Sequence, residues 1–464
     1  MYYKYIKSLT MEYHMPISRR SVLKLTGAAA AAAALSATEL QASEKAAKPI
    51  AKHQVVIIGG GFGGLTVAKE LKKADPNFDV LIIEKNETFM SCPFSNANLG
   101  KLKGVNLGTF VFDYDQAVER NGYSMLQSEV TAIDRKAKTV TTAKGVISYE
   151  YLVLSPGIEY NYKAQFPKWD KKKTDHIRRV APPALIPGKE HVILERQLVN
   201  MEDGNVIITV PAGKFRCPPA PFERACMIAA YMKKEEIQGK VIILNETASI
   251  AKGAAFNEAW SELYGNIIEH HANCKLSDVN TDKKTITYVQ TEGEMDDKKT
   301  KTLKYEVLNL IAYNKANPVI KMADLETTKD NFGKVVMNGC SFATKSDANV
   351  YAVGDVVGHG IPPSGQTANW AGKQCAKELA HKLHGKPFTL GVKTKTVTAG
   401  NVCYSMVGDQ PEEGIMVVHD FSYDGKVIKG KGHVPKGKDG KFRSKTTAKA
   451  TREWYRGIMN DLFA

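Results

Sequence analysis

Residues 53–64 read HQVVIIGGGFGG, an apolar strand-like run that enters a glycine-rich turn. A helix-like stretch follows at 65–73, and a second apolar run at 80–83 ends in Glu84. Strand, glycine turn, helix, strand and acidic residue in this order form the βαβ unit that binds a dinucleotide. The segment therefore predicts an α/β protein whose first domain is Rossmann-like.

Three glycines of this turn occupy the positions of the G-x-G-x-x-G motif: Gly59, Gly61 and Gly64. They allow a tight turn and let backbone N–H groups approach a pyrophosphate at a helix N-terminus. Glu84 lies twenty residues after the last of them, where a carboxylate can accept a hydrogen bond from an adenosine ribose. We expect these four residues to bind the cofactor.

Two later segments favour FAD over a nicotinamide dinucleotide. Residues 151–157, YLVLSPG, predict a buried strand that runs into a tight turn at Gly157. Residues 350–355, VYAVGD, predict a strand that ends in Gly354 and Asp355. There the carboxylate can bond the ribityl chain while the glycine lets the backbone pass close by. Either segment alone could be an ordinary turn, but their order behind the first motif favours FAD.

A second αβ unit lies between these segments, with strand-like runs at 206–210 and 241–244. Its turn, residues 211–219, reads PAGKFRCPP where a nicotinamide-binding domain would place glycines. Proline removes N–H donors and stiffens the backbone, so such a turn suits a pyrophosphate poorly. We therefore expect a second Rossmann-like domain without a site for NAD.

Three of the seven cysteines lie in separate settings far apart in the sequence: Cys92, Cys217 and Cys403. A flavin beside a pair of cysteines can move two electrons between sulfur and the isoalloxazine ring, so sulfur redox chemistry is the leading hypothesis. We expect the remaining cysteines to be small buried thiols: Cys226, Cys274, Cys340 and Cys375. No second ligand cluster supports a metal site, and no C-x-x-C-H motif provides for a c-type haem on this chain.

Residues 18–24, SRRSVLK, precede an apolar, alanine-rich run at 25–35. This pattern is typical of a twin-arginine signal peptide, here 1–42, and the apolar run is too short to span a bilayer. We expect a periplasmic protein without integral membrane contact.

The formal net charge of the chain is +15. The first 42 residues carry five basic and two acidic side chains, so their removal leaves a net charge of +12. This charge favours acidic partners, but no motif indicates nucleic-acid binding.

Together, these motifs resemble the flavoprotein subunit of flavocytochrome c sulfide dehydrogenase, a family of disulfide-reductase-like flavoproteins. The resemblance covers residues 53–464 and rests on segments that the family shares: C-x-x-S-N at 92–96, F-R-C-P-P-x-P-x-E-R at 215–224, Ser364-Gly365 with Ala368-Asn369, CYS at 403–405 and the tail at 454–463. It implies two Rossmann-like domains of the glutathione-reductase type and a C-terminal α+β interface domain. The expected boundaries are 53–172 and 299–388 for the FAD-binding domain, 173–298 for the second domain and 389–464 for the domain that covers the flavin.

The resemblance also implies roles for the three separate cysteines. Cys92 would carry FAD through a thioether to the flavin 8α-methyl group, although Pro93 departs from the family pattern. Cys217 and Cys403 would form a redox disulfide beside the isoalloxazine. Hydrosulfide attacks a disulfide sulfur and gives a persulfide and a thiolate. The electrons would then pass through FAD to a c-type cytochrome on a separate chain.

Three other residues are candidates for the flavin site. Glu223, six residues after Cys217, is a candidate base, or else a surface carboxylate in the first turn of a helix. Gly365 opens a helix predicted over 367–383, whose positive N-terminus suits negative charge on the reduced flavin. Trp454 either packs on the isoalloxazine or belongs to the core.

Two other functions remain open, namely a sulfide:quinone oxidoreductase and an accessory redox flavoprotein of a thiosulfate-oxidising system. A quinone enzyme needs an apolar surface that seats it on the membrane, whereas residues 421–452 carry ten Lys or Arg. A cluster within this stretch either recruits an acidic cytochrome or is a solvated basic loop: Lys429, Lys431, Lys436, Lys438, Lys441, Arg443 and Lys445.

Overall fold

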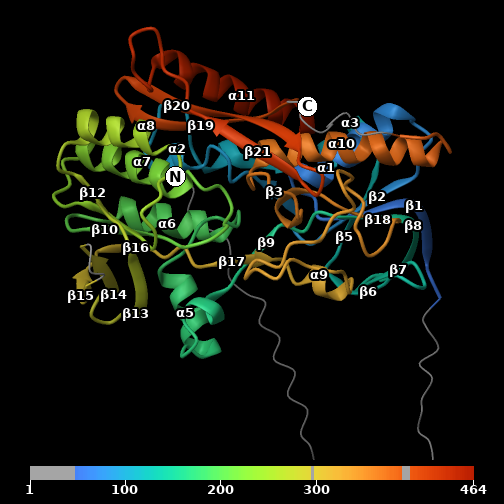
Figure 1. The fold of residues 1–464 in the computed structure, drawn as a ribbon, viewed down its shortest axis with the longest axis horizontal. Helices are drawn as coiled ribbons and strands as arrows, with labels where there is room; N and C mark the ends of the chain where they lie inside the picture. The colour runs from blue at the N-terminus through green and yellow to red at the C-terminus, as the bar shows by residue number, and fades with distance from the viewer. Residues whose placement is uncertain (1–47, 294–296, 389–397) are drawn as a thin grey trace, which may run out of the picture. The chain divides into compact units, whose positions relative to one another are not determined.

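The βαβ unit at the start of the described chain forms the centre of a largely parallel sheet (Figure 1). β1 (Ala51–Ile58) pairs in parallel with β2 (Val80–Glu84) on one side and with β8 (Gly145–Leu154) on the other. α1 (Phe62–Ala74) connects β1 to β2. β18 (Val350–Ala352) also pairs in parallel with β8, so a strand from far down the chain joins the first sheet.

The computed structural model describes residues 48–293, 297–388 and 398–464. The predicted signal peptide lies outside these residues. The first sheet has the order β5-β2-β1-β8-β7-β6, with β18 beside β8. Its remaining strands are β5 (Ser124–Gln127), β6 (Val130–Asp134) and β7 (Thr139–Thr142). Around it lie β3 (Thr88–Met90), α2 (Asn96–Leu99), η1 (Leu107–Phe110), β4 (Val111–Asp113), α3 (Tyr114–Asn121), α9 (Val319–Met322), η3 (Gly354–Val356) and α10 (Gly365–Leu383).

A second, fully parallel sheet has the order β12-β11-β10-β16. Every residue of β10 (Val206–Val210) and β11 (Val241–Asn245) is buried, which is typical of parallel strands covered on both faces. The other elements of this region are β9 (Ile158–Tyr160), α4 (Tyr162–Gln165), α5 (Lys171–Val180), α6 (Lys189–Val199), α7 (Ala220–Lys234), α8 (Gly253–Ala259), η2 (Trp260–Tyr264), β12 (Ile268–His271), β16 (Val307–Asn309) and β17 (Asn314–Ala316). An antiparallel sheet joins it: β13 (Cys274–Asn280), β14 (Thr285–Glu292) and β15 (Asp297–Lys304).

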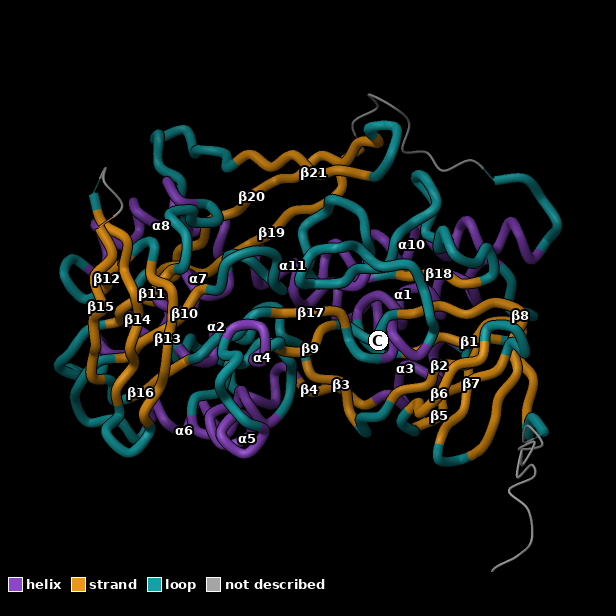
Figure 2. The backbone as a smooth tube through the Cα atoms, turned by 60° about the horizontal axis from the view of Figure 1, so that its bottom comes forward, coloured by secondary structure: helices purple, strands orange, loops and turns teal. Residues whose placement is uncertain are grey.

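The C-terminal part of the chain is an antiparallel sheet with one helix packed on it (Figure 2). Its strands are β19 (Thr398–Asp409), β20 (Glu412–Tyr423) and β21 (Ile428–His433), and α11 (Lys445–Phe463) packs on β20. β19 contacts α7 of the second domain and α10 beside the first sheet. The side chain of Ser444 caps α11 by accepting a hydrogen bond from the Thr447 N–H at 3.0 Å. This sheet therefore connects the two Rossmann-like regions.

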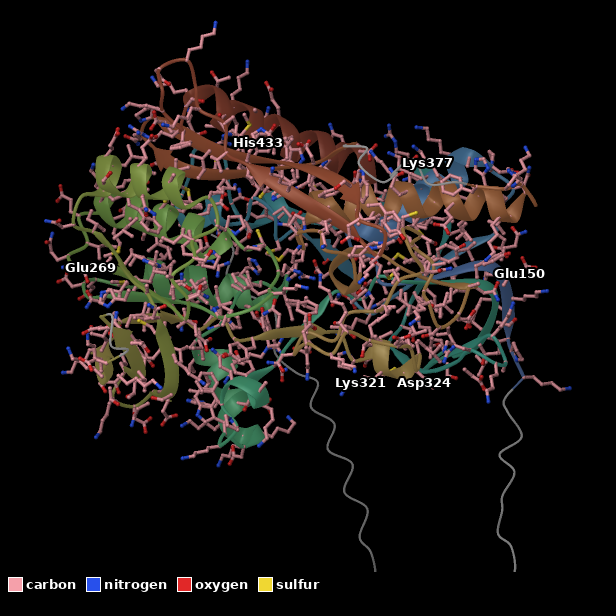
Figure 3. All side chains as sticks on the ribbon, viewed as in Figure 1. Glu150, Glu269, Lys321, Asp324, Lys377 and His433 are labelled. Carbon is pink, nitrogen blue, oxygen red and sulfur yellow. The ribbon has the colours of Figure 1, made fainter. Side chains whose placement is uncertain are left out.

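Charged side chains cover the surface of the described chain (Figure 3), but one expected surface cation is buried. Arg443 is only 8% exposed, and its guanidinium contacts Glu413 and Glu262, each at 2.7 Å, and Glu258 at 3.3 Å. Within the late basic cluster, the expectation of a free surface charge was therefore wrong for Arg443. The guanidinium instead ties the residues before α11 to α8, η2 and β20.

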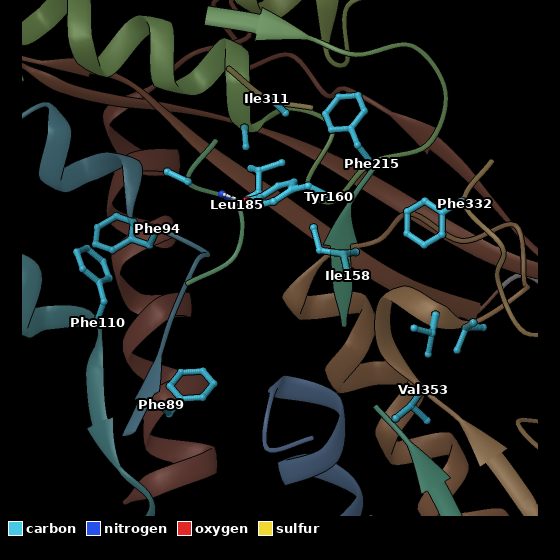
Figure 4. Close-up of a cluster of buried hydrophobic side chains, with 14 of the residues drawn as sticks. Phe89, Phe94, Phe110, Ile158, Tyr160, Leu185, Phe215, Ile311, Phe332 and Val353 are labelled. Atoms are coloured by element: carbon cyan, nitrogen blue, oxygen red, sulfur yellow. Dashed lines mark hydrogen bonds between the residues drawn. The ribbon is translucent and has the colours of Figure 1, made fainter. Parts of the chain in front are cut away.

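Aromatic and aliphatic side chains from all three regions form one connected core (Figure 4). Phe89 lies 5.0 Å from the ring of Phe463, so the last turn of α11 packs against the first region. Tyr160 is 4% exposed, and its hydroxyl accepts hydrogen bonds from the N–H groups of Leu185 at 3.0 Å and Ile186 at 2.9 Å. The core thus holds the regions together around the loops that form the site.

The α/β class with Rossmann-like sheets and a C-terminal domain is confirmed, whereas the domain boundaries stay a prediction. The structure places the helix starts two or three residues earlier than expected, at Phe62 and Gly365.

The expectation that the remaining cysteines are buried was wrong for Cys340, which lies in a loop and is half-buried; Cys226, Cys274 and Cys375 are buried. Within the described ranges, we find no helix that combines the length and apolar character needed to cross a membrane.

Candidate functional site

A cavity of about 850 Å³ lies where loops of the three regions meet. Its walls include the glycine turn after β1, the segment around Cys92, the start of α7 and parts of β19 and α11. All predicted site residues line it except Gly64: Gly59, Gly61, Glu84, Cys92, Gly157, Cys217, Glu223, Gly354, Asp355, Gly365, Cys403 and Trp454. Residues from distant parts of the sequence therefore converge on a single binding site.

The glycine turn has the form that a dinucleotide requires. A Cβ atom on Gly59 would lie 2.3 Å from the carbonyl oxygen of Ser155, and one on Gly64 would lie 2.0 Å from the carbonyl oxygen of Gly59. These two glycines therefore serve the close packing of backbone segments. At Gly61, no protein atom lies within 4 Å of such a Cβ, and no side chain caps α1 there. The N-terminus of α1 is thus open to a pyrophosphate.

Glu84 has a structural task beside its expected contact with ribose. Its Oε2 accepts a hydrogen bond from the Gly60 N–H at 2.7 Å, and its Oε1 accepts one from the Asn86 N–H at 2.9 Å. The carboxylate therefore fixes the glycine turn relative to the end of β2. The hydrogen bond to a ribose stays a prediction.

The sequence did not indicate Arg216 as a site residue. Its Nε donates to Oδ2 of Asp355 at 2.7 Å, and its Nη1 donates to the Leu185 carbonyl at 3.0 Å. Its Nη2 lies 2.6 Å from the same carboxylate oxygen, which completes an ion pair. Gly157 has φ +73°, and a Cβ there would lie 2.6 Å from Nη2 of Arg216. Gly157 therefore allows the tight turn and also leaves space for the guanidinium of Arg216.

Cys92, Cys217 and Cys403 all face this cavity. Cys217 has φ +54°, an unusual value for a residue with a side chain, and its N–H donates to the Pro363 carbonyl at 2.8 Å. Burial raises the pKa of the Cys217 thiol well above its usual range, and negative charge on Cys403 and Cys92 raises it further. Negative charge on Cys403 or Cys92 therefore affects the ionisation of Cys217. The expected disulfide stays a prediction, because each cysteine carries a free thiol here.

Glu223 is buried at the start of α7, so the alternative of a surface carboxylate was wrong. It is 7% exposed; Oε1 accepts from the Met406 N–H at 2.8 Å and Oε2 accepts from Asn96 Nδ2 at 3.1 Å. Burial raises the pKa of this carboxyl above its ordinary value, against the lowering effect of these hydrogen bonds and of the Lys252 charge. A carboxyl with a raised pKa holds a proton to higher pH than an ordinary glutamate and can therefore act as a proton acceptor or donor.

Lys252 is a second residue that the sequence did not indicate. It is 8% exposed, and its Nζ donates to the Cys403 carbonyl at 2.8 Å and to Ser405 Oγ at 2.9 Å. A single lysine in a loop has no motif, and a lysine is most often a surface residue. Only the fold reveals that the Lys252 side chain reaches the backbone of β19 at Cys403.

Gly365 and Trp454 lie together at another part of the wall. A Cβ on Gly365 would lie 2.8 Å from Cγ of Pro93, so this glycine allows the Cys92 segment to pack on the start of α10. Trp454 Nε1 donates to Gln366 Oε1 at 2.7 Å, which joins α11 to the same helix start. Trp454 lines the cavity, in keeping with either of its expected roles.

The turn at 211–219 keeps one contact of the glycine turn but has fewer donors. The N–H of Ala212 donates to Oε2 of Glu246 at 3.0 Å, as the N–H of Gly60 donates to Glu84 in the first region. Pro211, Pro218 and Pro219 carry no N–H, so this turn suits a pyrophosphate poorly. Glu246 follows β11, where the acidic residue of a dinucleotide-binding unit would contact a ribose.

Models of three protein families match the described chain. "Pyridine nucleotide-disulphide oxidoreductase" matches residues 53–181, "Sulfide dehydrogenase [flavocytochrome c] flavoprotein chain, central" matches 191–312, and "Flavocytochrome c sulphide dehydrogenase, flavin-binding" matches 396–463. A model of the twin-arginine translocation signal matches 16–36, so the chain carries an export signal that directs it to the periplasm.

Individual proteins agree with these matches. The sulfide dehydrogenase [flavocytochrome c] flavoprotein chain of Chlorobaculum thiosulfatiphilum is 52% identical over 44 residues, which are 10% of this chain and 92% of that sequence. The mitochondrial sulfide:quinone oxidoreductase of mouse is 24% identical over 315 residues, and the alignment spans 65% of each chain, just under two thirds. The sulfide:quinone oxidoreductase structure from Aquifex aeolicus superposes with a TM-score of 0.65 at 17% identity, over 88% of this chain and 91% of that chain.

The glycine turn, the flavin-binding C-terminal region and the shared FRCPP segment lead to one assignment. The protein is a FAD-binding flavoprotein of the pyridine-nucleotide-disulfide oxidoreductase type, and it belongs to the family of flavocytochrome c sulfide dehydrogenase flavoprotein chains.

Proposed function

We propose that this protein oxidises hydrosulfide through a Cys217–Cys403 disulfide and FAD, and that a c-type cytochrome takes the electrons. The observation that carries the proposal is the convergence of Cys92, Cys217, Cys403 and Glu223 on the cavity of a flavoprotein. FAD, when bound, accepts two electrons together and can release them one at a time.

The residues of the chain would bind and orient the cofactor. The open N-terminus of α1 at Gly61 would hold the pyrophosphate, and Asp355, fixed by Arg216, would hold the ribityl chain. Cys92 would attach the flavin through a thioether. Burial raises the pKa of the Cys92 thiol, whereas the charges of Arg216 and Arg224 lower it and so favour the thiolate that such attachment needs.

The sulfur chemistry would take place at the cysteine pair. The hydrosulfide sulfur attacks one sulfur of the disulfide, a new S–S bond forms, and the bond between Cys217 and Cys403 breaks. The electron pair of that bond goes to the leaving sulfur as a thiolate. We assign the flavin-proximal position to Cys217, because its proline-flanked turn is held by a hydrogen bond to Pro363. Glu223 would hold the proton released in the course of turnover.

A sulfide:quinone oxidoreductase is the second candidate, because the mouse relative and the Aquifex aeolicus structure bear that name. One observation favours the cytochrome instead. Within the residues that the structure describes, the large apolar side chains that are exposed are Ile50, Val111, Val192, Val199 and Met322. None belongs to the C-terminal sheet or α11, where an apolar surface for a membrane would be expected.

Steady-state turnover with sulfide and either cytochrome c or a short-chain quinone tests the proposal. Reduction of cytochrome c by the wild type, and its loss in Cys217→Ser, is the expected result. Cys340→Ser is the matched control, because this half-buried cysteine lies outside the cavity wall. Reduction of the quinone alone would assign the second candidate, and the absence of turnover with both acceptors would favour an accessory flavoprotein.

The disulfide itself is tested by peptide mapping under non-reducing conditions. We expect one cross-linked peptide that joins Cys217 to Cys403 in the oxidised protein. Two free thiols in fully oxidised, active protein would contradict the mechanism.

A further inference from the structure

Lys252 joins the second Rossmann-like sheet to the strand that carries Cys403. It precedes α8 in the loop after β11, where its backbone has φ +61°, and its side chain extends to β19. In a dinucleotide-binding unit, this edge of the sheet would face the ligand. Here the edge supplies a lysine that contacts β19 at Cys403, a residue of the cavity wall, whereas Lys252 itself does not line the cavity.

The ammonium group of Lys252 is buried next to neutral acceptors. Its hydrogen bonds go to the Cys403 carbonyl at 2.8 Å and to Ser405 Oγ at 2.9 Å. No carboxylate among the described residues forms a direct ion pair with it. A buried cation without an anionic partner is costly, so a negative charge that forms on a nearby buried group would be favoured.

The groups that surround this charge are those of the proposed chemistry. The charge of Lys252 lowers the pKa of Cys217 and of Glu223, and it lowers the pKa of His419 on β20. Negative charges on Cys403, Cys92 and Glu223 raise the pKa of Cys217. Lys252 and Arg224 are the cations whose charges interact with Cys217.

We propose that Lys252 is a positioning residue for the Cys217–Cys403 pair: it fixes the Cys403 segment and stabilises the thiolate that forms when the pair opens. The inference rests on the proposed function. Attack by hydrosulfide, with one negative charge, converts the neutral disulfide into a neutral persulfide and a thiolate with one negative charge. The negative charge therefore moves from the substrate into the buried site, where Lys252 can balance it.

Alkylation of the reduced protein by iodoacetamide, followed by mass spectrometry of the peptides with Cys217 and Cys403, measures thiolate formation directly. The variants are Lys252→Met and Lys252→Gln, which remove the charge, and Lys252→Arg, which keeps it. Lys240→Met is the matched control, because Lys240 pairs with Glu269 on the surface (Figure 3).

For the neutral variants, we expect the pH of half-maximal alkylation at Cys217 to rise by about one unit or more. Lys252→Arg and Lys240→Met should keep the wild-type profile. An unchanged profile in Lys252→Met and Lys252→Gln would overturn the proposal. If both neutral variants fail to fold while Lys252→Arg folds, Lys252 serves stability alone, and the proposal is also wrong.

The two proposals fail in different ways. A wild type that does not oxidise sulfide would contradict the proposed function, whatever the alkylation profile. A wild type that turns over sulfide, together with neutral variants whose profile and turnover are unchanged, would contradict the role of Lys252 alone.

Discussion

Arg216 forms an ion pair with Asp355 across 139 positions of sequence: its Nε donates a hydrogen bond to Oδ2 at 2.7 Å, and its Nη2 lies 2.6 Å from the same oxygen. Asp355 is 8% exposed and follows β18 of the first sheet, whereas Arg216 directly precedes Cys217. This ion pair therefore fixes the cysteine-bearing turn of the second region to the cofactor edge of the first. Burial raises the pKa of the Cys92 thiol, and the charge of Arg216 acts against this increase.

Replacement of Arg216 should destabilise the fold. Arg216→Met would leave the buried carboxylate of Asp355 without its partner, at a cost of about 3–5 kcal/mol in the free energy of unfolding. Urea denaturation of the variant and the wild type measures this difference. Lys214→Met is the control, because the exposed Lys214 lies 3.6 Å from Asp330 and such a pair contributes about 1 kcal/mol or less. Equal losses in the two variants would contradict the structural role of Arg216.

The flavin should stay attached to the denatured chain through Cys92. After precipitation with acid, we expect flavin fluorescence in the wild-type protein and in Cys340→Ala, but not in Cys92→Ala. The Cys92→Ala protein should still bind FAD before denaturation, because the glycine turn and Asp355 are unchanged. Complete release of flavin from the denatured wild type would show that the thioether assignment is wrong.

NADH and NADPH should not reduce the flavin at a useful rate. The turn at 211–219 contains Pro211, Pro218 and Pro219, which carry no N–H. A pyrophosphate would therefore meet few donors there. Anaerobic spectroscopy of the flavin checks this expectation, with sulfide as the positive control. Rapid bleaching by NADH would overturn our interpretation of the second domain.

Glu223 should make stability depend on pH. Burial is the main cause that raises its folded-state pKa above the ordinary value of 4.5. A raised carboxyl pKa adds stability that is fully present below the unfolded-state pKa and is lost as the pH rises through the folded-state pKa. Compared with Glu223→Gln, which cannot titrate, the wild type should lose relative stability as the pH rises above about 4.5 and through the folded-state pKa. Unfolding free energies of both proteins, measured as the pH rises, test this expectation; a constant difference would contradict a raised pKa.

The sequence predicted those parts of the site that rest on local patterns. The glycine turn, its following acid and the Gly-Asp end of β18 are recognisable because each requires particular residues at fixed spacing. Their positions in the cavity follow from parallel strands ending at one edge of a sheet. Glu223 lines the cavity, and its role as a base stays a prediction; only the packing of β19 on α7 shows that it is buried.

Other features depend on contacts between distant segments, and no local pattern indicates them. Arg216 and Lys252 would each pass for surface cations until the fold places Asp355 and Cys403 beside them. Arg443 was misjudged for the same reason, because its three carboxylate partners come from elsewhere in the chain. Long cationic side chains of this kind are the residues whose role a sequence reveals least.

The last prediction concerns the electron acceptor. Within the late basic cluster, Arg443 is buried. Lys429 forms an ion pair with Asp424 at 2.6 Å, and Lys441 forms one with Glu262 at 2.8 Å. Its other members are exposed: Lys431, Lys436, Lys438 and Lys445. If these charges guide an acidic c-type cytochrome, the association rate should fall about tenfold or more between 0.01 M and 0.15 M salt, as the Debye length shortens from about 30 Å to about 8 Å.

A charge-reversal variant separates local guidance from the effect of net charge. Replacement of Lys431, Lys436 and Lys438 by glutamate should slow cytochrome reduction at low salt and flatten its salt dependence. The control replaces three exposed lysines of the β13–β15 sheet by glutamate: Lys275, Lys298 and Lys304. This control changes the net charge by the same amount as the first variant, but on a sheet that Figure 1 shows away from β21. Stopped-flow reduction of the cytochrome measures both rates. Equal slowing in the two variants would assign the effect to net charge, and a wild-type rate independent of salt would contradict electrostatic guidance while leaving the partner itself in place.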